Sequence, residues 1–546
     1  MQSAAGGAES PLELIRRVLV LPTIVFSSFA GTSIWFAPNA VVSSVPFRGG
    51  NPGSEDADVA LLTSMVQVGF VVGTIAIAFF AVADRFPATL VFAAASVLGA
   101  ICNGACAATS SLEAWAALRF LVGCCEAGIY PLAMTVAHRI YPQGLGARLG
   151  LLVGALTLGT AFPWLLKAAL DPGGGTGTGE AGGPAVSYVL VLLLVSALAA
   201  LGGLAMPLVI GSGRAQPSGD KVAPAAPLKR GGAADADREP SHKQASLTPG
   251  LTQAGAASEA AADRSGAPAG PARPGLQLGR AEVGEIWASR PFRAAALGYI
   301  GHCWEVYSFW AFVPALIRGY TAHIEAGGVA GASPSFSVEA LSFVAIAVGA
   351  PGSALVGLFS LYPSCRYTTR HPGRKRHCRA GADTGAAETG LRTLDVSGAA
   401  DSERRTLGRE EEVVIPGSAV GAIVSIATSF VCCLIAPAYR RMSEPVFILF
   451  LVVWGGTVVS DSGQFSSLSA GNAPRRLVGT ALTMVVTLGY TTTIVSLQVV
   501  GALLNAQIDP GMALLVLAPG AAIGLAATYA EWPLHRSYCQ PRTRGV

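Results

Sequence analysis

Charged residues are scarce in this chain, and their scarcity excludes most classes of soluble protein. Only 13% of the 546 residues are Asp, Glu, Lys or Arg, whereas 51% are hydrophobic, and soluble proteins carry about 25% charged residues. The formal net charge of +4 is too small to indicate a nucleic-acid partner. The apolar residues lie in long runs, and runs of about 18 or more predict membrane-spanning helices. The composition therefore predicts an α-helical protein that crosses a membrane several times.

The sequence also has little that indicates catalysis or metal binding. We find no nucleophile–base set, no phosphate-binding loop and no metal cluster, so we expect neither an enzyme nor a cofactor. The nearest approach to a metal site is the set Cys365, His371, His377 and Cys378. Its spacing matches no structural zinc pattern. We therefore expect a solvated loop there.

Twelve apolar runs are each long enough to cross about 30 Å of hydrocarbon. The first six are Val18–Val45, Ala60–Ala83, Ala88–Ala108, Leu112–His138, Gly146–Leu170 and Ser187–Gly211. The second six are Ala294–Arg318, Val338–Tyr362, Val413–Ala436, Val446–Ala470, Val478–Leu504 and Gly511–Ala530. The sequence thus predicts an all-α membrane protein with six spans before a long polar segment and six after it.

The domain organisation follows from these runs and the polar segments between them. We expect a cytosolic N-terminus at 1–17, an N-terminal six-helix bundle at 18–211, a disordered linker at 212–285, a C-terminal six-helix bundle at 286–530 and a cytosolic tail at 531–546. The C-terminal bundle holds a second polar insertion at 363–412. The linker has almost no aromatic residues, and the insertion mixes basic and acidic residues, so we expect both to be disordered loops. The basic run at 374–377 could touch anionic lipid, although a solvated loop is the better interpretation.

The distribution of basic residues predicts the orientation. Outside the two long loops, ten Arg or Lys residues lie on the side that would hold both termini, against five on the other side. Basic residues accumulate on the cytoplasmic side of membrane proteins. We therefore expect a multi-pass protein with both termini in the cytosol, in the plasma membrane rather than an organelle.

The two sets of six spans show a trace of duplication. Span five begins Arg148-Leu-Gly-Leu-Leu-Val-Gly154-Ala-Leu-Thr157, and span eleven begins Arg476-Leu-Val-Gly479-Thr-Ala-Leu-Thr483. Parallel repeats of this kind place a substrate site between the halves, near the middle of the membrane.

This pattern resembles the major facilitator superfamily (MFS) of secondary transporters. The motifs that carry the resemblance are Ala83-Asp84-Arg85-Phe86-Pro87 after span two and Arg119-Phe-Leu-Val-Gly123-Cys-Cys-Glu126-Ala-Gly128 in span four. The resemblance implies twelve transmembrane helices in two pseudo-symmetric six-helix bundles. It also implies a gating role for Asp84 and Arg85, with Asp84 contacting the start of span eleven, where a carboxylate favours the positive end of a helix.

Further stretches look like a bacterial-type branch that is grouped with cyanate and nitrate permeases. They are Gly31-Thr-Ser-Ile-Trp35-Phe-Ala-Pro-Asn39-Ala, Gly298-Tyr-Ile-Gly-His302-Cys-Trp304-Glu305-Val-Tyr307 and Val458-Val-Ser-Asp461-Ser-Gly-Gln464-Phe-Ser. Spans two and eight have no central Arg, which argues against nitrate itself. The fold implies a substrate cavity lined by Trp35, Asn39, Trp304, Tyr307 and Gln464, with interhelical packing as the alternative for the aromatic residues.

Five ionisable residues within the spans are the candidate substrate and coupling groups: Arg119, Glu126, His302, Glu305 and Asp461. An ionisable group in the membrane core costs at least about 2.5–3.5 kcal/mol and usually faces a cavity or a partner. We expect Glu305, with Glu126 or Asp461, to bind and release a proton, while Arg119 steadies a carboxylate or holds an anionic substrate. His302 is the weaker candidate. The alternative is that these residues form buried pairs that only hold helices together.

The sequence thus predicts a transporter that moves a small polar or organic-anion solute by alternating access, with proton symport as the favoured coupling. A uniporter of the same fold and a non-transporting membrane receptor or sensor are the alternatives. The expected partners are membrane lipid, a small-molecule solute and a proton, and we expect a monomer that binds no nucleic acid.

Overall fold

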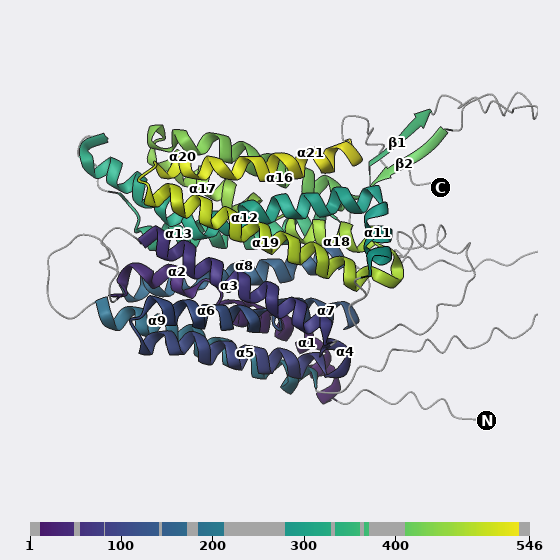
Figure 1. The fold of residues 1–546 in the computed structure, drawn as a ribbon, viewed down its shortest axis with the longest axis horizontal. Coiled ribbons are helices and arrows are strands. Elements are labelled where there is room, and N and C mark those ends of the chain that lie inside the picture. Colours follow the sequence, from purple (N-terminus) through teal and green to yellow (C-terminus); the bar gives the residue numbers. More distant parts are fainter. Residues whose placement is uncertain are drawn as a thin grey trace, which may run out of the picture.

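Long helices that run side by side form two bundles, one from each half of the chain (Figure 1). The computed structural model describes residues 11–47, 55–80, 82–140, 145–171, 184–211, 279–328, 334–360, 365–370 and 410–533. The N-terminal bundle lies below the C-terminal one in Figure 1, and the helix axes of both follow the long axis of the molecule.

The N-terminal bundle is built from helices up to Ile210. They are α1 (Pro11–Thr32), α2 (Ala37–Val41), α3 (Glu55–Phe79), α4 (Val82–Arg85), α5 (Ala88–Ala105), α6 (Leu112–Glu126), α7 (Tyr130–Ile140), α8 (Leu145–Leu170) and α9 (Pro184–Ile210). Short 3₁₀ turns at Val42–Ser44 and Cys106–Ala108 extend α2 and α5.

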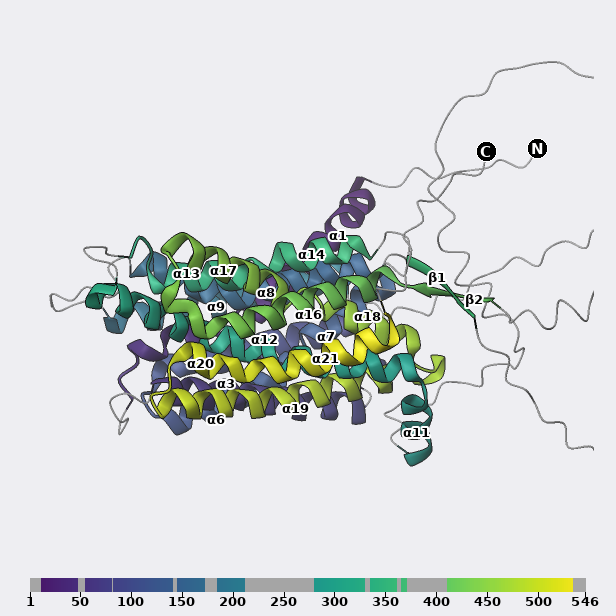
Figure 2. The same cartoon turned by 90° about the horizontal axis from the view of Figure 1, so that it is seen from above.

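The C-terminal bundle begins with a short helix, α11 (Arg280–Ala288), that stands roughly across the others (Figure 2). The bundle helices are α12 (Arg290–His323), α13 (Val338–Ala347), α14 (Gly349–Phe359), α16 (Gly417–Ile435), α17 (Glu444–Val458), α18 (Ser462–Asn472), α19 (Val478–Asn505), α20 (Pro510–Leu514) and α21 (Ala518–Glu531). Single turns connect some of them: a π turn at Ile324–Gly328 and 3₁₀ turns at Ala436–Arg441, Arg475–Leu477 and Leu515–Leu517.

These helices account for the twelve predicted spans. Within the described residues, ten helices are long and apolar enough to cross a membrane, and α1 with α2 makes an eleventh that is bent by 53°. The twelfth is α12, which has 34 residues but carries polar and aromatic side chains that lower its mean hydropathy. Large apolar side chains point outward from both bundles, for example Leu208 in the N-terminal bundle and Leu449 in the C-terminal bundle. The prediction of an all-α membrane protein with twelve transmembrane helices in two six-helix bundles is confirmed.

Two short parts of the predicted loops have regular structure. At the two edges of the insertion 363–412, strands β1 (Cys365–Arg370) and β2 (Glu410–Ile415) pair antiparallel, so that their backbone groups are hydrogen-bonded to each other. The predicted linker 212–285 overlaps α11, which begins at Arg280 because an acidic first turn and the apolar Ile286 and Trp287 favour a helix there. The remainder of both segments, 212–278 and 371–409, lies outside the described residues, as do His371, His377 and Cys378.

Close contact between the halves depends on glycine. Helix α8 packs against α13 and α14 across the interface, and α3 packs along α19. A Cβ atom at Gly150 would lie 2.5 Å from the carbonyl oxygen of Ser353, and one at Gly154 would lie 2.9 Å from that of Ala350. Small residues let transmembrane helices approach until their backbones touch. The interface between α8 and α14 therefore has no room for a side chain at these two positions.

Candidate functional site

Two transmembrane helices are interrupted at corresponding positions of the two halves. In span four, α6 ends at Glu126 and α7 begins at Tyr130; in span ten, α17 ends at Val458 and α18 begins at Ser462. Interrupted helices at matching places in a duplicated bundle mark binding sites, because the break frees backbone groups and makes room for a ligand. Each break carries one carboxylate, Glu126 in the first and Asp461 in the second.

A small pocket lies between the halves where the two breaks meet. Its walls come from α7 and α8 of the N-terminal bundle and from α12 and the α17–α18 break of the C-terminal bundle. The lining residues are Tyr130, Val153, Leu156, Tyr299, His302, Val306, Tyr307, Trp310, Val459 and Ser462. The walls are thus mainly aromatic and aliphatic, with a few polar groups, as is usual for small-molecule sites.

His302 and Asp461 form a buried pair at this pocket. Nδ1 of His302 lies 2.8 Å from Oδ1 of Asp461, and the two side chains are only 3% and 2% exposed. The two atoms are within ion-pair distance but do not have the alignment of a hydrogen bond. The pair therefore places one imidazole and one carboxylate in direct contact at the pocket wall.

Glu126 is buried beside the pocket without a hydrogen-bond partner. The side chain is fully buried, and neither carboxylate oxygen has a partner among the described residues. Glu126 is the last residue of α6 and precedes Tyr130 of the pocket wall by four residues. A buried carboxylate with no donor is costly, so this group is a candidate to bind a proton or a ligand.

Arg119 holds the bend of the first span. Its Nη1 donates to the carbonyl oxygen of Ile34 at 2.9 Å, and its Nη2 donates to that of Trp35. These carbonyls belong to the interruption between α1 and α2, where helical hydrogen bonds are lost. Nη1 also lies 3.5 Å from Oδ1 of Asn103. Arg119 therefore satisfies backbone groups with its two Nη atoms, while its Nε has no hydrogen-bond partner among the described residues.

Glu305 faces the interior of the C-terminal bundle. Its Oε1 accepts hydrogen bonds from the Ser429 hydroxyl, from Nε1 of Trp454 at 2.8 Å and from the Cys433 thiol at 3.2 Å. His302 and Glu305, both candidate coupling residues on α12, therefore have different surroundings. His302 contacts Asp461 and lines the pocket, whereas Glu305 joins α12 to α16 and α17.

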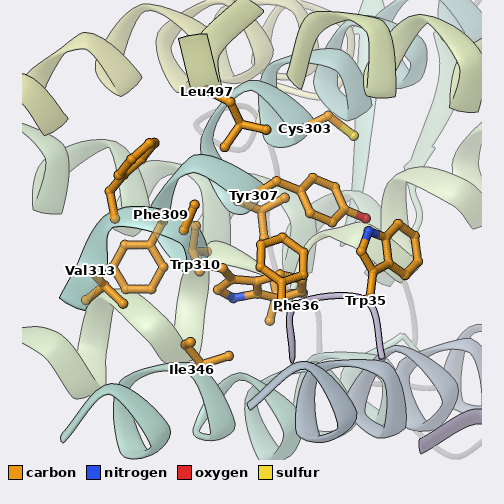
Figure 3. Close-up of a cluster of buried hydrophobic side chains, with 14 of the residues drawn as sticks. Trp35, Phe36, Cys303, Tyr307, Phe309, Trp310, Val313, Ile346 and Leu497 are labelled. Carbon is orange, nitrogen blue, oxygen red and sulfur yellow. The ribbon is translucent and has the colours of Figure 1, made fainter. Parts of the chain in front are cut away.

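A cluster of aromatic rings crosses the interface between the halves (Figure 3). Trp35 stacks on Phe70 with ring centroids 5.1 Å apart and on Tyr307 at 6.0 Å, and Phe36 contacts Trp310 edge-on at 5.8 Å. The Tyr307 and Tyr490 hydroxyls are hydrogen-bonded to each other. Of the rings from the C-terminal half, Tyr307 and Trp310 line the pocket. The predicted cavity residues Trp35 and Tyr307 are thus brought together, although Trp35 is not itself in the pocket wall.

The other predicted cavity residues lie elsewhere. The Asn39 amide pairs with the Thr63 hydroxyl at 3.0 Å, and Nε1 of Trp304 donates to the carbonyl oxygen of Val516 while the ring covers Gly520 of α21. Gln464 is fully buried on α18, and its amide has no partner among the described side chains and backbone. None of the three is in the pocket wall.

The predicted gate falls on α4. The Asp84 side chain lies outside the described part of the structure, and Arg85 is exposed at the end of that helix. The predicted contact between Asp84 and the start of span eleven therefore stays a prediction.

Ion pairs join the halves at the end opposite the β1–β2 hairpin. Arg318 of α12 contacts Glu55 at 3.3 Å and Asp56 at 3.0 Å, both at the start of α3. Lys167 of α8 lies 3.8 Å from Glu339 of α13 and donates to the Ser43 hydroxyl at 3.2 Å. These residues were missed in the sequence because they sit at span ends, where charge is ordinary.

The pocket residues Tyr130, Tyr299 and Trp310 were also missed. Aromatic residues within apolar runs resemble core residues, and only the helix break makes Tyr130 conspicuous. Gly128, two residues before Tyr130, is the feature of the sequence that indicates this break.

Comparison with known proteins places this site in a familiar fold. The family model described as Major Facilitator Superfamily matches residues 20–369. The nucleoside transporter NupG has a similar structure, with a TM-score of 0.51 and 12% identity over 94% of this chain and 99% of that chain. A bacterial homolog to the human lysosomal transporter Spinster, in an inward-facing and unoccupied conformation, has a TM-score of 0.50 and 14% identity over 96% of this chain and 94% of that chain. No curated protein matched the sequence.

Proposed function

Because this chain belongs to the Major Facilitator Superfamily, a family of transporters, we propose that it moves a small polar or organic-anion solute across the membrane by alternating access, driven by proton symport. The observation that carries the proposal is the pocket between the halves, where the interruptions of spans four and ten meet. A site at that place is open to one side of the membrane when the halves rock one way and to the other side when they rock back.

The buried pair His302–Asp461 supports proton coupling. His302 lines the pocket and contacts Asp461, so the protonation of the pair affects the binding of a solute in the pocket, and the bound solute affects the protonation in turn. Glu126 is the second candidate, since its carboxylate is buried without a donor. We assign Glu305 a positioning role instead, because its Oε1 is occupied by three donors.

The site gives an anionic solute less support than a polar one. The guanidinium of Arg119, the expected anion ligand, is engaged by backbone carbonyls. The cyanate and nitrate branch therefore stays a proposal that rests on sequence motifs alone. From the distribution of basic residues we propose that both termini lie in the cytosol. We also propose that the protein lies in the plasma membrane and is a monomer.

Uptake into proteoliposomes tests the function. The panel contains amino acids, sugars, organic anions, organic amines and, because of the structural likeness to NupG, nucleosides, each with and without an inward proton gradient. We expect at least one solute to accumulate beyond protein-free liposomes, and the gradient to raise its accumulation. In Asp461→Asn, exchange of the solute should persist while gradient-driven accumulation is lost, and Glu113→Gln, an exposed carboxylate on α6, should behave as wild type.

Other outcomes separate the alternatives. A gradient that has no effect on the wild-type protein indicates a uniporter. The receptor alternative predicts that no solute moves and that deletion of residues 215–280 abolishes function. If no solute moves under any gradient, the transport proposal is wrong.

A further inference from the structure

We propose that the solute is a small organic cation, an ammonium group on a planar or aromatic body, held between the aromatic walls of the pocket with its charge towards Glu126. This inference rests on the proposed transport function and names the substrate class of the same site. Of the two solute classes that the sequence predicts, a small polar solute or an organic anion, it keeps the first and departs from the second.

The walls of the pocket are suited to a cation. Four of the lining residues are aromatic: Tyr130, Tyr299, Tyr307 and Trp310. The faces of such rings carry negative partial charge, and an ammonium group within about 6 Å of a ring centre is attracted, more strongly where water is excluded. All four side chains are at most 8% exposed, so water does little to weaken this attraction.

Glu126 supplies the charge that an ammonium group requires. Its carboxylate is fully buried, has no hydrogen-bond donor among the described residues, and stands at the helix break four residues before Tyr130 of the pocket wall. Arg119, two helical turns earlier on α6, donates with its Nη atoms to the carbonyls of the α1–α2 bend and not to this carboxylate. A ligand N–H would therefore give the carboxylate the donor that no described residue provides.

An anion finds no equivalent partner. None of the described residues that line the pocket is Lys or Arg. Lys167, a buried cation of the same half, lies at the far end of α8 and is paired with Glu339. The two helix breaks hold the carboxylates Glu126 and Asp461, whereas the buried cation of span four, Arg119, directs its Nη atoms to backbone carbonyls of the α1–α2 bend.

The remaining polar atoms limit the ligand further. Nε1 of Trp310 is buried without an acceptor, so a ligand oxygen placed beside it would satisfy the indole N–H. Asp461, paired with His302, and Glu126, which has no donor, are two separate carboxylates. A proton on the first and an ammonium on the second can be bound together, as symport of a cation requires.

A series of similar size and different charge tests the inference on the unmodified protein. Phenylethylammonium, phenylpropionate and phenylpropionamide differ in charge on the same phenylethyl body, and binding is measured by thermal stabilisation of purified protein in detergent. We expect phenylethylammonium to bind at least about tenfold more tightly than the other two, the order expected for a charge-assisted hydrogen bond. Equal or tighter binding of phenylpropionate or phenylpropionamide overturns the inference.

Variants locate the charge. Glu126→Gln should weaken phenylethylammonium binding by about 10- to 100-fold, whereas Glu113→Gln, the same change at an exposed position of α6, should have no effect. For transport, phenylethylguanidinium, which keeps its charge and its N–H donors at neutral pH and therefore does not cross the bilayer unaided, should enter wild-type proteoliposomes and not those with Glu126→Gln. Uptake of an anion or a neutral solute in place of the organic cations refutes the inference and leaves the transport function standing, whereas absence of uptake for the whole panel refutes both.

Discussion

Replacement of Glu305 separates a coupling role for this carboxylate from a positioning role. Glutamine keeps the Oε1 acceptor, so the donors from Ser429, Cys433 and Trp454 stay satisfied while the charge is removed. If Glu305 positions α12 against α16 and α17, as we propose, Glu305→Gln should keep gradient-driven uptake. Loss of that uptake in a folded Glu305→Gln protein would show that the carboxylate carries the proton.

The magnitude of the structural effect follows from the three donors. Glu305→Ala removes their acceptor, and a buried donor left unsatisfied costs about 1–3 kcal/mol. The Ser429 hydroxyl and the Trp454 indole N–H together then cost about 2–6 kcal/mol, while the Cys433 thiol is a weak donor and adds little. We expect a clear fall in the free energy of unfolding for Glu305→Ala and a much smaller one for Glu305→Gln.

Two assays read these effects separately. Thermal unfolding of the purified protein in detergent reports stability, and proteoliposome uptake with a proton gradient reports coupling. Glu325→Ala removes an exposed carboxylate beyond the C-terminal end of α12 and should match the wild type in both. Equal stability of Glu305→Ala and wild type would refute the account of the three hydrogen bonds.

Three further substitutions test how the halves are held and moved. Arg119→Lys replaces the planar guanidinium fork, whose two Nη atoms each reach one carbonyl of the α1–α2 bend, with a compact ammonium group, so it should lose about 1.5–3 kcal/mol of stability in thermal unfolding. Lys167→Met leaves the Glu339 carboxylate, 14% exposed, without its cation. We expect a cysteine introduced beside Glu339 to be labelled faster in this variant, and the additional change Glu339→Gln to restore the slower labelling. Unchanged labelling in Lys167→Met would mean that the pair does not close this end of the interface. Gly150→Val places a Cβ 2.5 Å from a carbonyl of α14 and should abolish uptake, while Gly479→Val, with no atom within 4 Å of its Cβ, should retain it.

The fold could be predicted from the sequence because its signal is the length of the apolar runs. A span of about 20 apolar residues has few alternatives in a membrane, since every backbone group must be bonded internally. Helix α12 shows that the signal is not only hydropathy: its polar and aromatic residues place it outside the strict range, yet its length and position identify it. The β1–β2 hairpin was missed because β1 is polar and basic, and because the apolar end of β2, residues 413–415, reads as the start of the following span, predicted as Val413–Ala436.

The candidate site could be predicted only in part. Buried ionisable residues are conspicuous in an apolar helix, so Glu126, His302 and Asp461 were found. Their partners could not be inferred, because contacts between helices depend on rotation about each axis and on where a helix is interrupted. Arg119 is an example: its position suggested an anion ligand, whereas its guanidinium lies against the carbonyls of the α1–α2 bend.

The two interruptions suggest how one duplicated element can serve two ligands. Spans four and ten break at corresponding places, and each break carries a carboxylate. The halves differ in what surrounds that carboxylate, since Asp461 lies 2.8 Å from His302 whereas Glu126 has no donor. A carboxylate beside an imidazole is suited to exchange a proton, and a carboxylate without a donor is suited to receive an ammonium group. If this division is correct, Asp461→Asn and Glu126→Gln should fail differently, the first losing the response to the proton gradient and the second losing the solute. Identical defects in the two variants would mean that the carboxylates act as one site.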